Sequence, residues 1–273
     1  MGISFSVAGA VATIMTLLSR VYITRYFDIE TVGIYQASWT ISNIYVGTIL
    51  TDMGVDLMPR LMKVTRSNTK LNKLVNEQME LGMLVASIGV VGILVFSPIV
   101  LHLLYSSEFI VGTNIIRWQV LGVSLRVLAF PFSYGIMARG KSLIYIIVQS
   151  VFWVGEYLLL ILFIKLVGFD GLGINYFVAY SGYFTMILIA SRYIFNFRFS
   201  KLLKKVILIS YLFIAAAFLL SNLLPNTYSI ALGVALLIGQ AIWINHELKN
   251  KMDMNLWQYI KCKLNKKRNK GGK

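Results

Sequence analysis

The chain consists of eight apolar stretches, each about 17 to 25 residues long, separated by short polar segments. Roughly 20 apolar residues in a helix cross a bilayer core about 30 Å thick, so each stretch can span it. The stretches lack strict alternation, and backbone groups in hydrocarbon need internal partners, which favours helices over barrel strands. The pattern predicts an all-α polytopic membrane protein with about eight transmembrane helices, near residues 3–23, 32–58, 81–104, 113–138, 143–167, 172–192, 206–224 and 228–244.

Composition also indicates a membrane protein. Hydrophobic residues make up 58% of the chain and charged residues only 14%, which is too little polar surface for a soluble fold. The first apolar stretch has no basic residue before it and no convincing cleavage site ahead of Arg20, so we expect a retained helix rather than a signal peptide. The single cysteine, Cys262, lies in a lysine-rich tail, which points to a reducing cytosolic face.

Basic residues are distributed unevenly between the two sides of the membrane that these helices define. Most of the 26 lysines and arginines fall in three connecting segments and the C-terminal tail, all on one side. Cytoplasmic loops carry such an excess, so both termini are expected in the cytoplasm. The tail from Lys249 to Lys273 is expected to bind anionic membrane lipids, at about 1 kcal/mol per lysine. The net charge of +15 therefore requires no nucleic-acid partner.

Intramembrane polar residues divide the chain into unequal parts. Nearly all of them lie in the first six apolar stretches, and the last two stretches are almost purely apolar. We therefore expect a six-helix functional lobe over residues 1–200, two additional transmembrane helices over 201–247 and a basic cytoplasmic tail over 248–273. Between the second and third stretches, residues 60–78 place their apolar side chains on one face, interrupted near Ser67, and predict an amphipathic interfacial helix.

A polar line runs along the first helix. It extends about 21 Å at 1.5 Å per residue, which is most of the hydrocarbon core. Small residues and hydroxyls also mark helix contacts in lipid, so the line indicates either helix packing or a cavity wall that ends in the Arg20 cation. Its members follow a 3, 4, 3, 4 spacing: Ser6, Gly9, Thr13, Thr16 and Arg20.

The second helix is polar on two faces at once, so neither of these faces suits lipid. Asp52 and Asp56 lie one turn apart near its end and either pair with Arg60 or Lys63 or form a cation or proton site. The first face carries Gln36, Thr40, Asn43 and Gly47, and the second carries Ser38, Ser42, Tyr45, Asp52 and Asp56.

Arg126 lies near the middle of the fourth stretch, where insertion scales put an arginine at roughly 2.5 to 3.5 kcal/mol unfavourable, so it needs a partner or water. Glu156, near the middle of the fifth stretch, is the expected partner. Arg117 precedes Arg126 by about two and a half turns and so faces the opposite side, as a third and more interfacial candidate cation. The sixth helix carries a face of tyrosines that either pack or bind a ligand: Tyr176, Tyr180 and Tyr183.

No residue pattern indicates an enzyme. The two histidines are isolated, and HExxH, P-loop and nucleophile-elbow motifs are missing from the sequence, so we expect no catalytic residue, no metal and no cofactor. Arginines along a cavity suit an anion, and phosphate above all, because a planar guanidinium binds its oxygens bidentately. The polar lining of this cavity is expected to include Thr13, Thr16, Gln36, Asn43, Gln119 and Gln149.

Several sequence blocks occur in a characteristic order. They are GIYQASWTISNIYVGTIL at 33–50, MPRL at 58–61, LVNEQMELG at 74–82, LLYSSEF at 103–109 and IIRWQVLGVSLRVLAFPFSYGIMARGK at 115–141. In this order they resemble the second half of O-antigen flippases, the Wzx family of the multidrug/oligosaccharidyl-lipid/polysaccharide exporter superfamily. The resemblance covers about residues 1–200.

The resemblance implies two six-helix, MATE-like lobes facing each other across a central cavity, often with two extra C-terminal helices. It implies alternating access that moves an undecaprenyl-pyrophosphate-linked oligosaccharide across the bacterial inner membrane. Arg20 and Arg126 would be cavity cations for the pyrophosphate or for acidic sugars, and the candidates for ion coupling would be Asp52, Asp56 and Glu156.

Members of that family carry both lobes in one chain, whereas this sequence resembles only the second. It is then either part of a split or truncated flippase or a half-transporter that pairs with another chain. A single lobe would expose its polar stripes to lipid, so we expect a partner lobe or a homo-oligomer. Two alternatives remain: a related exporter of drugs or of another lipid-linked precursor, and a non-transporting scaffold subunit of a polysaccharide assembly complex.

Overall fold

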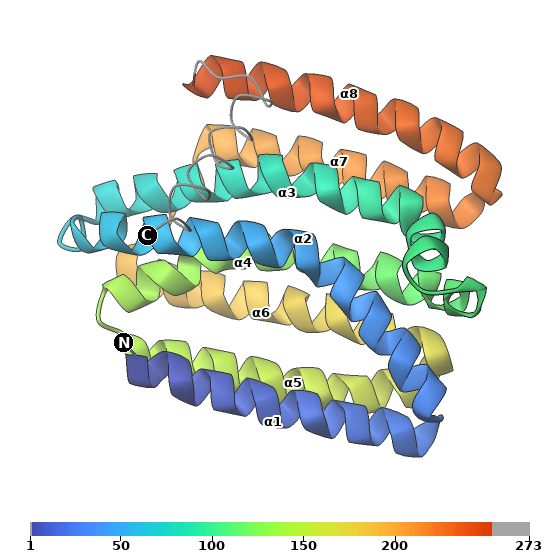
Figure 1. The fold of residues 1–273 in the computed structure, drawn as a ribbon. Helices are drawn as coiled ribbons and strands as arrows, with labels where there is room; N and C mark the ends of the chain where they lie inside the picture. The colour runs from blue at the N-terminus through green and yellow to red at the C-terminus, as the bar shows by residue number, and fades with distance from the viewer. Residues whose placement is uncertain (1, 253–273) are drawn as a thin grey trace, which may run out of the picture.

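Long helices run back and forth across the molecule (Figure 1). The computed structural model describes residues 2–252, and within them every regular element is helical, which confirms the all-α fold class. Two short 3-10 helices, η1 (Ser107–Gly112) and η2 (Gly168–Asp170), lie in connections. The α-helices are α1 (Gly2–Tyr26), α2 (Ile29–Met62), α3 (Asn68–Leu104), α4 (Thr113–Ala138), α5 (Ser142–Val167), α6 (Gly171–Phe195), α7 (Lys201–Leu223) and α8 (Asn226–Met252).

Most of these helices can cross a bilayer. Six spans among the described residues are long and apolar enough, and one of them, Ser142–Phe195, comprises both α5 and α6. Helix α2 is outside this set because polar residues interrupt it, yet its 34 residues reach about 51 Å at 1.5 Å per residue. The chain is a multi-pass membrane protein. With α5 and α6 counted separately the spans contain seven helices, which is roughly consistent with the predicted eight.

Polar side chains define where several helices begin. The Asp28 carboxylate accepts a hydrogen bond from the Thr31 backbone N–H at 2.6 Å and caps α2. The Ser200 hydroxyl accepts from the Leu203 N–H at 2.9 Å and caps α7. Each oxygen satisfies a backbone donor that the first helical turn leaves unpaired.

The predicted amphipathic helix over residues 60–78 is wrong. Helix α2 continues to Met62, and α3 begins directly after Ser67, whose hydroxyl accepts from the Lys70 N–H at 3.4 Å. The apolar positions Leu71 and Val75 are fully buried in the protein core. The amphipathic pattern arises because this face packs on protein rather than on lipid headgroups.

The helices form a central group with a pair on either side. Helix α1 packs along α5 on one side, whereas α7 and α8 pack against α3 on the other (Figure 1). Helices α2, α4 and α6 lie between, and α4 packs most extensively on α6. At the outer pair, Lys205 Nζ on α7 forms an ion pair with Glu247 Oε1 on α8 at 2.6 Å.

Two glycines allow the close contact between α4 and α6. A Cβ on Gly122 would lie 2.7 Å from a Tyr176 ring carbon, and one on Gly173 would lie 2.7 Å from the Ile115 carbonyl oxygen. Small residues at such positions let helix backbones approach in a membrane protein. The contact brings the tyrosine face of α6 against the middle of α4.

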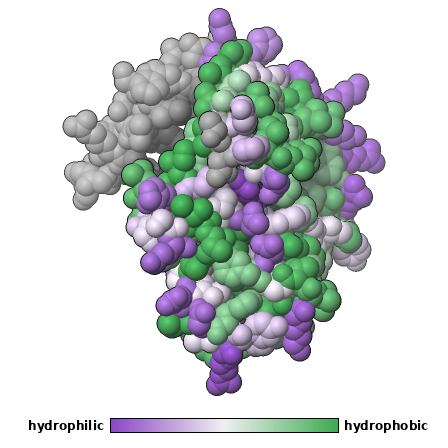
Figure 2. Space-filling model, turned by 90° about the vertical axis from the view of Figure 1, so that its right-hand side faces the viewer, coloured by the Kyte–Doolittle hydropathy of each residue, from purple (hydrophilic) through white to green (hydrophobic). Residues whose placement is uncertain are grey.

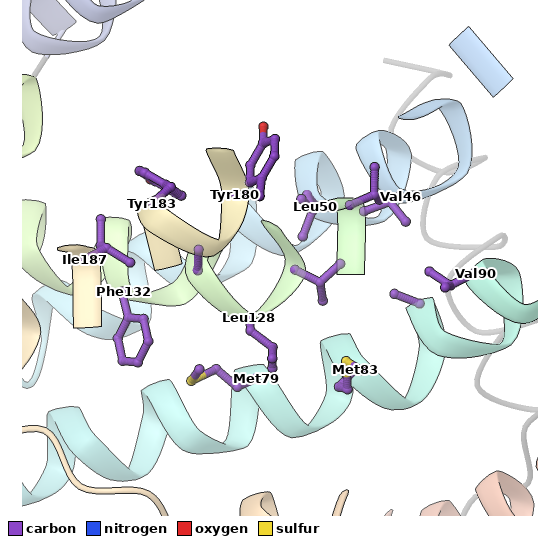
Figure 3. Packing of buried hydrophobic residues seen from close by; sticks show 14 of the residues in the cluster. Val46, Leu50, Met79, Met83, Val90, Leu128, Phe132, Tyr180, Tyr183 and Ile187 are labelled. Carbon is purple, nitrogen blue, oxygen red and sulfur yellow. The ribbon is translucent and has the colours of Figure 1, made fainter. Parts of the chain in front are cut away.

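The core is continuous from α4 to α3. Leu128 and Phe132 project from α4 toward Met79 and Met83 of α3 (Figure 3), and all four are at most 2% exposed. At one end of the bundle, where the α1–α2 turn and η1 lie, hydrophilic residues are scattered among hydrophobic ones (Figure 2). Cys262 and most of the predicted basic tail lie outside the described residues.

Candidate functional site

Arg126 is the centre of a polar cluster inside the bundle. Its Nη1 donates to Asn43 Oδ1 on α2 at 2.8 Å, and the Tyr176 hydroxyl on α6 donates to the same oxygen at 2.9 Å. Asn43 Nδ2 donates to the Trp39 carbonyl at 2.9 Å, which orients the amide so that its oxygen faces the guanidinium. Asn43, Arg126 and Tyr176 are called the Arg126 cluster below.

Aromatic residues surround this cluster. The hydroxyls of Tyr176, Tyr180 and Tyr183 lie within electrostatic range of the guanidinium. The Phe152 ring of α5 packs on the Tyr180 and Tyr183 rings, with centroids 4.7 and 4.8 Å apart. Tyr183 is in turn held by a 2.9 Å hydrogen bond between its hydroxyl and that of Ser133. The tyrosine face of the sixth helix, for which the sequence left two interpretations open, therefore lies next to the cation.

The predicted Arg126–Glu156 pair is wrong. Glu156 Oε1 instead accepts a hydrogen bond from Asn175 Nδ2 on α6 at 3.1 Å. The reason is helix order in space: α6 packs against both α4 and α5, which have little direct contact with each other. Helical periodicity identifies the face of a residue but not which helix lies opposite it.

As a result, Arg126 has no carboxylate within salt-bridge distance in the described part of the chain. Its known partners are a neutral amide and neutral hydroxyls. A guanidinium carries five N–H donors, and a cation in hydrocarbon is costly without a counter-charge. An anionic ligand would therefore stabilise the Arg126 guanidinium in this position.

A second polar group lies around Glu156, and we call Glu156, Asn175, Tyr35 and Arg20 the Glu156 cluster. Glu156 is 5% exposed, and Asn175 is fully buried with its Oδ1 unpartnered. The Tyr35 hydroxyl lies within electrostatic range of both Glu156 and Arg20. The cluster brings together α1, α2, α5 and α6.

The polar line of α1 satisfies much of its own hydrogen bonding. The Thr13 hydroxyl donates to the Gly9 carbonyl at 2.9 Å and the Thr16 hydroxyl to the Ala12 carbonyl at 2.8 Å. Thr13 is exposed and Thr16 half-buried. Arg20 is half-buried, and its Nε is buried without a hydrogen-bond partner among the described residues.

Arg117 has a different environment from Arg126. It is 7% exposed, and its Nη1 donates to Asn222 Oδ1 on α7 at 3.4 Å, so it is directed toward the α7 side. Gln119 is fully buried and accepts from the Ser42 hydroxyl at 3.1 Å, which links α4 to α2. Neither residue makes a hydrogen bond within the Arg126 cluster.

The remaining candidates lie closer to the surface. Gln36 is half-buried and donates to the Thr40 hydroxyl at 3.5 Å, and Gln149 is half-buried and hydrogen-bonds the Tyr145 hydroxyl. Asp52 is half-buried one turn before Asp56.

For Asp56, the ion pair of its side chain helps to choose between a surface ion pair and an ion site. Its Oδ2 lies 3.5 Å from Arg60 Nη1, and Arg60 Nη2 lies 3.9 Å from Glu77 Oε2. The Asp56 side chain is 60% exposed. This favours the surface ion pair over an intramembrane ion site for Asp56.

Sequence reasoning missed Tyr35 and Asn175. Tyr35 lies on the polar second face of α2, one turn before Ser38, whereas Asn175 lies within an apolar stretch, and only the packing of the helices brings the two near Glu156. A polar residue within an apolar stretch is the signal that could have found Asn175.

Comparisons with known proteins support the architecture. No family model matches the chain. It is 26% identical over 148 residues to the lipid III flippases of Escherichia coli (strain K12) and Shigella flexneri, a match that covers 54% of this chain and 34% of each of theirs. In structure, 90% of the chain superposes on the lipid II flippase MurJ in its inward closed conformation, with a TM-score of 0.70 and 14% identity. The chain has the fold of about half of MurJ.

The chain matches only part of the length of these relatives. This chain covers 53% of MurJ and 34% of the lipid III flippases, so it spans about half or less of the proteins it matches. The similar proteins are flippases and not enzymes, in agreement with the lack of catalytic motifs.

Proposed function

We propose that this chain is one lobe of a flippase that moves a lipid-linked oligosaccharide across the bacterial inner membrane. The Arg126 cluster carries the proposal, because it holds a cation among neutral partners in a MurJ-like fold. Its chemistry suits the pyrophosphate of a polyprenyl carrier, whose oxygens match the donors of a guanidinium.

The cargo is proposed to be an undecaprenyl-pyrophosphate-linked repeat unit of O-antigen or another surface polysaccharide. The sequence resemblance to O-antigen flippases supports this choice, and the similarity to lipid II and lipid III flippases supports a lipid-linked precursor over a drug. The second candidate cargo, which the same observations support, is a different lipid-linked precursor.

A partner lobe is part of the proposal. On α1 and α2, Gly9, Thr13, Thr48 and Thr51 are exposed although they belong to membrane-length helices. A second lobe would cover such residues better than lipid does. The 53% coverage of MurJ agrees with one lobe of two.

Ion coupling is proposed for the Glu156 cluster. A buried carboxylate with a neutral amide partner and an unpartnered amide oxygen beside it can bind and release a proton or a cation. Asp52 is a weaker candidate near the end of α2, and Asp56 is assigned to its pair with Arg60.

The test is complementation in a strain that lacks its own flippase for an undecaprenyl-linked repeat unit, with this chain co-expressed with a six-helix first lobe. Surface glycan should appear with the unmodified pair and be lost with Arg126→Ala, and Arg126→Lys should restore it only in part. Arg25→Ala, at an exposed arginine, is the matched control. If Arg126→Ala leaves glycan export intact while membrane levels are unchanged, the chain is a scaffold subunit and the proposal is wrong.

Orientation is tested with the single cysteine. If both termini are cytoplasmic, a membrane-impermeant maleimide should label Cys262 in inverted vesicles and leave it unlabelled in intact spheroplasts. Cys262→Ser is the control for background labelling. Labelling in intact spheroplasts would reverse the predicted topology.

A further inference from the structure

A cavity of about 650 Å³ lies where the beginning of α3 meets the end of α6. Two arginines and three asparagines dominate its lining, which includes no carboxylate among the described residues. It is distinct from both intramembrane clusters and is not used by the proposed transport function. The lining residues are Asn68, Thr69, Asn72, Arg192, Asn196, Phe197 and Arg198.

The segment between α6 and α7 begins at Asn196, whose backbone is left-handed (φ 52°, ψ 48°), and buried and exposed side chains alternate from Phe195 to Arg198. Phe195 and Phe197 are buried at 0% and 2% exposure, and the Phe197 ring packs on Phe132 with centroids 4.6 Å apart. Arg198 falls on the opposite side of the segment and is exposed. The aromatic anchors therefore direct this arginine toward the cavity.

Two asparagines of α3 form hydrogen bonds with the backbone of the same segment. Asn72 Nδ2 donates to the carbonyls of Phe195 and Asn196, each at 3.2 Å, and Asn72 Oδ1 accepts from the Arg198 N–H at 3.3 Å. Asn76 Nδ2 donates to the Arg198 carbonyl at 3.0 Å. Both backbone groups of Arg198 are thus fixed, which pre-organises the cationic wall.

The charge in this region is positive. Arg139, at the end of α4, donates to the Asn68 side-chain oxygen and sets a third guanidinium beside the lining. Asn68 and Thr69 also belong to the first turn of α3, whose free N–H groups favour an anion. The nearby carboxylate of Glu80 is 3% exposed and accepts from the Ser200 hydroxyl at 2.9 Å.

The position of the cavity indicates the level of the lipid headgroups. Tyr193, next to Arg192 on the last turn of α6, is 87% exposed, and tyrosines of this kind concentrate at the membrane–water boundary. Leu202, just beyond the segment, is also exposed. Apolar surface therefore flanks the cationic cavity, as an acyl chain beside a bound phosphate would require.

We propose that this cavity binds the phosphodiester headgroup of an anionic glycerophospholipid. Arg192 and Arg198 would bind the phosphate oxygens, while the acyl chains would lie along the exposed end of α6. Basic pockets between transmembrane helices bind anionic lipid headgroups in this way. The site would be separate from any electrostatic attraction of the C-terminal tail.

The test uses the full chain in nanodiscs of phosphatidylglycerol and phosphatidylcholine, with retained lipid measured by native mass spectrometry. Phosphatidylglycerol should be retained in preference to phosphatidylcholine, and R192Q/R198Q should reduce this retention about tenfold. The control K201Q/K204Q removes the same charge from two exposed lysines outside the lining and should change retention less than about twofold.

Three outcomes would overturn the proposal. The first is equal retention of the two lipids, and the second is an equal loss in both double variants, which would reduce the effect to net charge. The third is binding of inorganic phosphate that is lost in R192Q/R198Q without any preference for phosphatidylglycerol, which would assign the cavity to a soluble anion. Circular dichroism of each variant checks that helix content is unchanged.

Discussion

Arg126 and Arg117 lie on the same helix but in different environments. Arg126 is held between α2 and α6 by the Asn43 oxygen at 2.8 Å and is surrounded by tyrosine hydroxyls. Arg117 contacts Asn222 on α7 at 3.4 Å and has a buried, unpartnered Nε. The difference teaches that the face of α4 decides the environment of an arginine: one face meets α2 and α6, and the other meets α7.

The largest expected effect separates the two arginines directly. Arg126→Ala should reduce flipping about 100-fold or more, because a bidentate contact to phosphate consists of two charge-assisted hydrogen bonds. Arg117→Ala should leave flipping within about twofold and lower the melting temperature instead. Glycan export by the complemented strain and thermal unfolding of the purified chain measure the two effects. Equal losses of export would remove the distinction.

Glu156→Gln is expected to have the next largest effect. The amide is nearly the same size and can still hydrogen-bond Asn175, but it cannot lose a proton or carry a charge. Transport should lose its dependence on the driving ion gradient while lipid-linked cargo still binds. Asp56→Asn, at the exposed end of α2, is the control and should leave coupling intact. Gradient-driven transport in proteoliposomes makes the comparison.

Tyr176→Phe should have a smaller effect on the Arg126 side. It removes the 2.9 Å hydrogen bond to Asn43 but keeps the ring that packs on Tyr180. Loss of one neutral hydrogen bond, about 0.5–1.5 kcal/mol, corresponds to an activity change of roughly two- to tenfold. Tyr211→Phe removes a comparable hydroxyl contact, to Ser124 at 3.0 Å, outside the cluster. A larger loss in Tyr211→Phe would argue against a specific role for the cluster.

The smallest effect is expected outside the membrane, at the cap of α2. The Thr31 backbone N–H donates to Asp28 and holds the pKa of that carboxyl below its usual value. Because this pKa is lower in the folded than in the unfolded protein, the cap stabilises the folded protein at pH values above the unfolded-state pKa. This contribution is lost as pH falls through the folded-state pKa. Asp28→Asn should keep the cap and remove its pH dependence, whereas Asp28→Ala should lose both. Thermal unfolding between pH 3 and 7 measures the difference.

Much of the architecture was accessible from hydrophobic patterning. Six membrane-length apolar spans and the helical class follow from runs that are too long and too continuous for strands. The pattern also selected Arg126 and Glu156, since ionisable groups inside such runs are costly and therefore uncommon. It was wrong about residues 60–78, because an amphipathic face fits a protein core as well as an interface.

Partner identity depended on helix order in space. Asn43 and Tyr176 lie 83 and 50 residues from Arg126 in sequence. Neither this sequence separation nor helical periodicity predicts that they contact Arg126. The glycine contact between α4 and α6 brings the tyrosine face against the cation, and α6 then keeps Glu156 away. Similarly, the cavity between the beginning of α3 and the end of α6 needs the segment after α6, which Phe197 and Asn72 anchor.

The sequence by itself determined that this protein crosses a membrane many times as helices and that charged groups occur within them. Hydrocarbon imposes these features on the chain one segment at a time, because each segment must satisfy its own backbone. Only the tertiary structure decided that Arg126 meets Asn43 and Tyr176 while Glu156 meets Asn175. Those pairings depend on which helices are neighbours, and neighbours are selected by packing over the whole bundle rather than by any one segment.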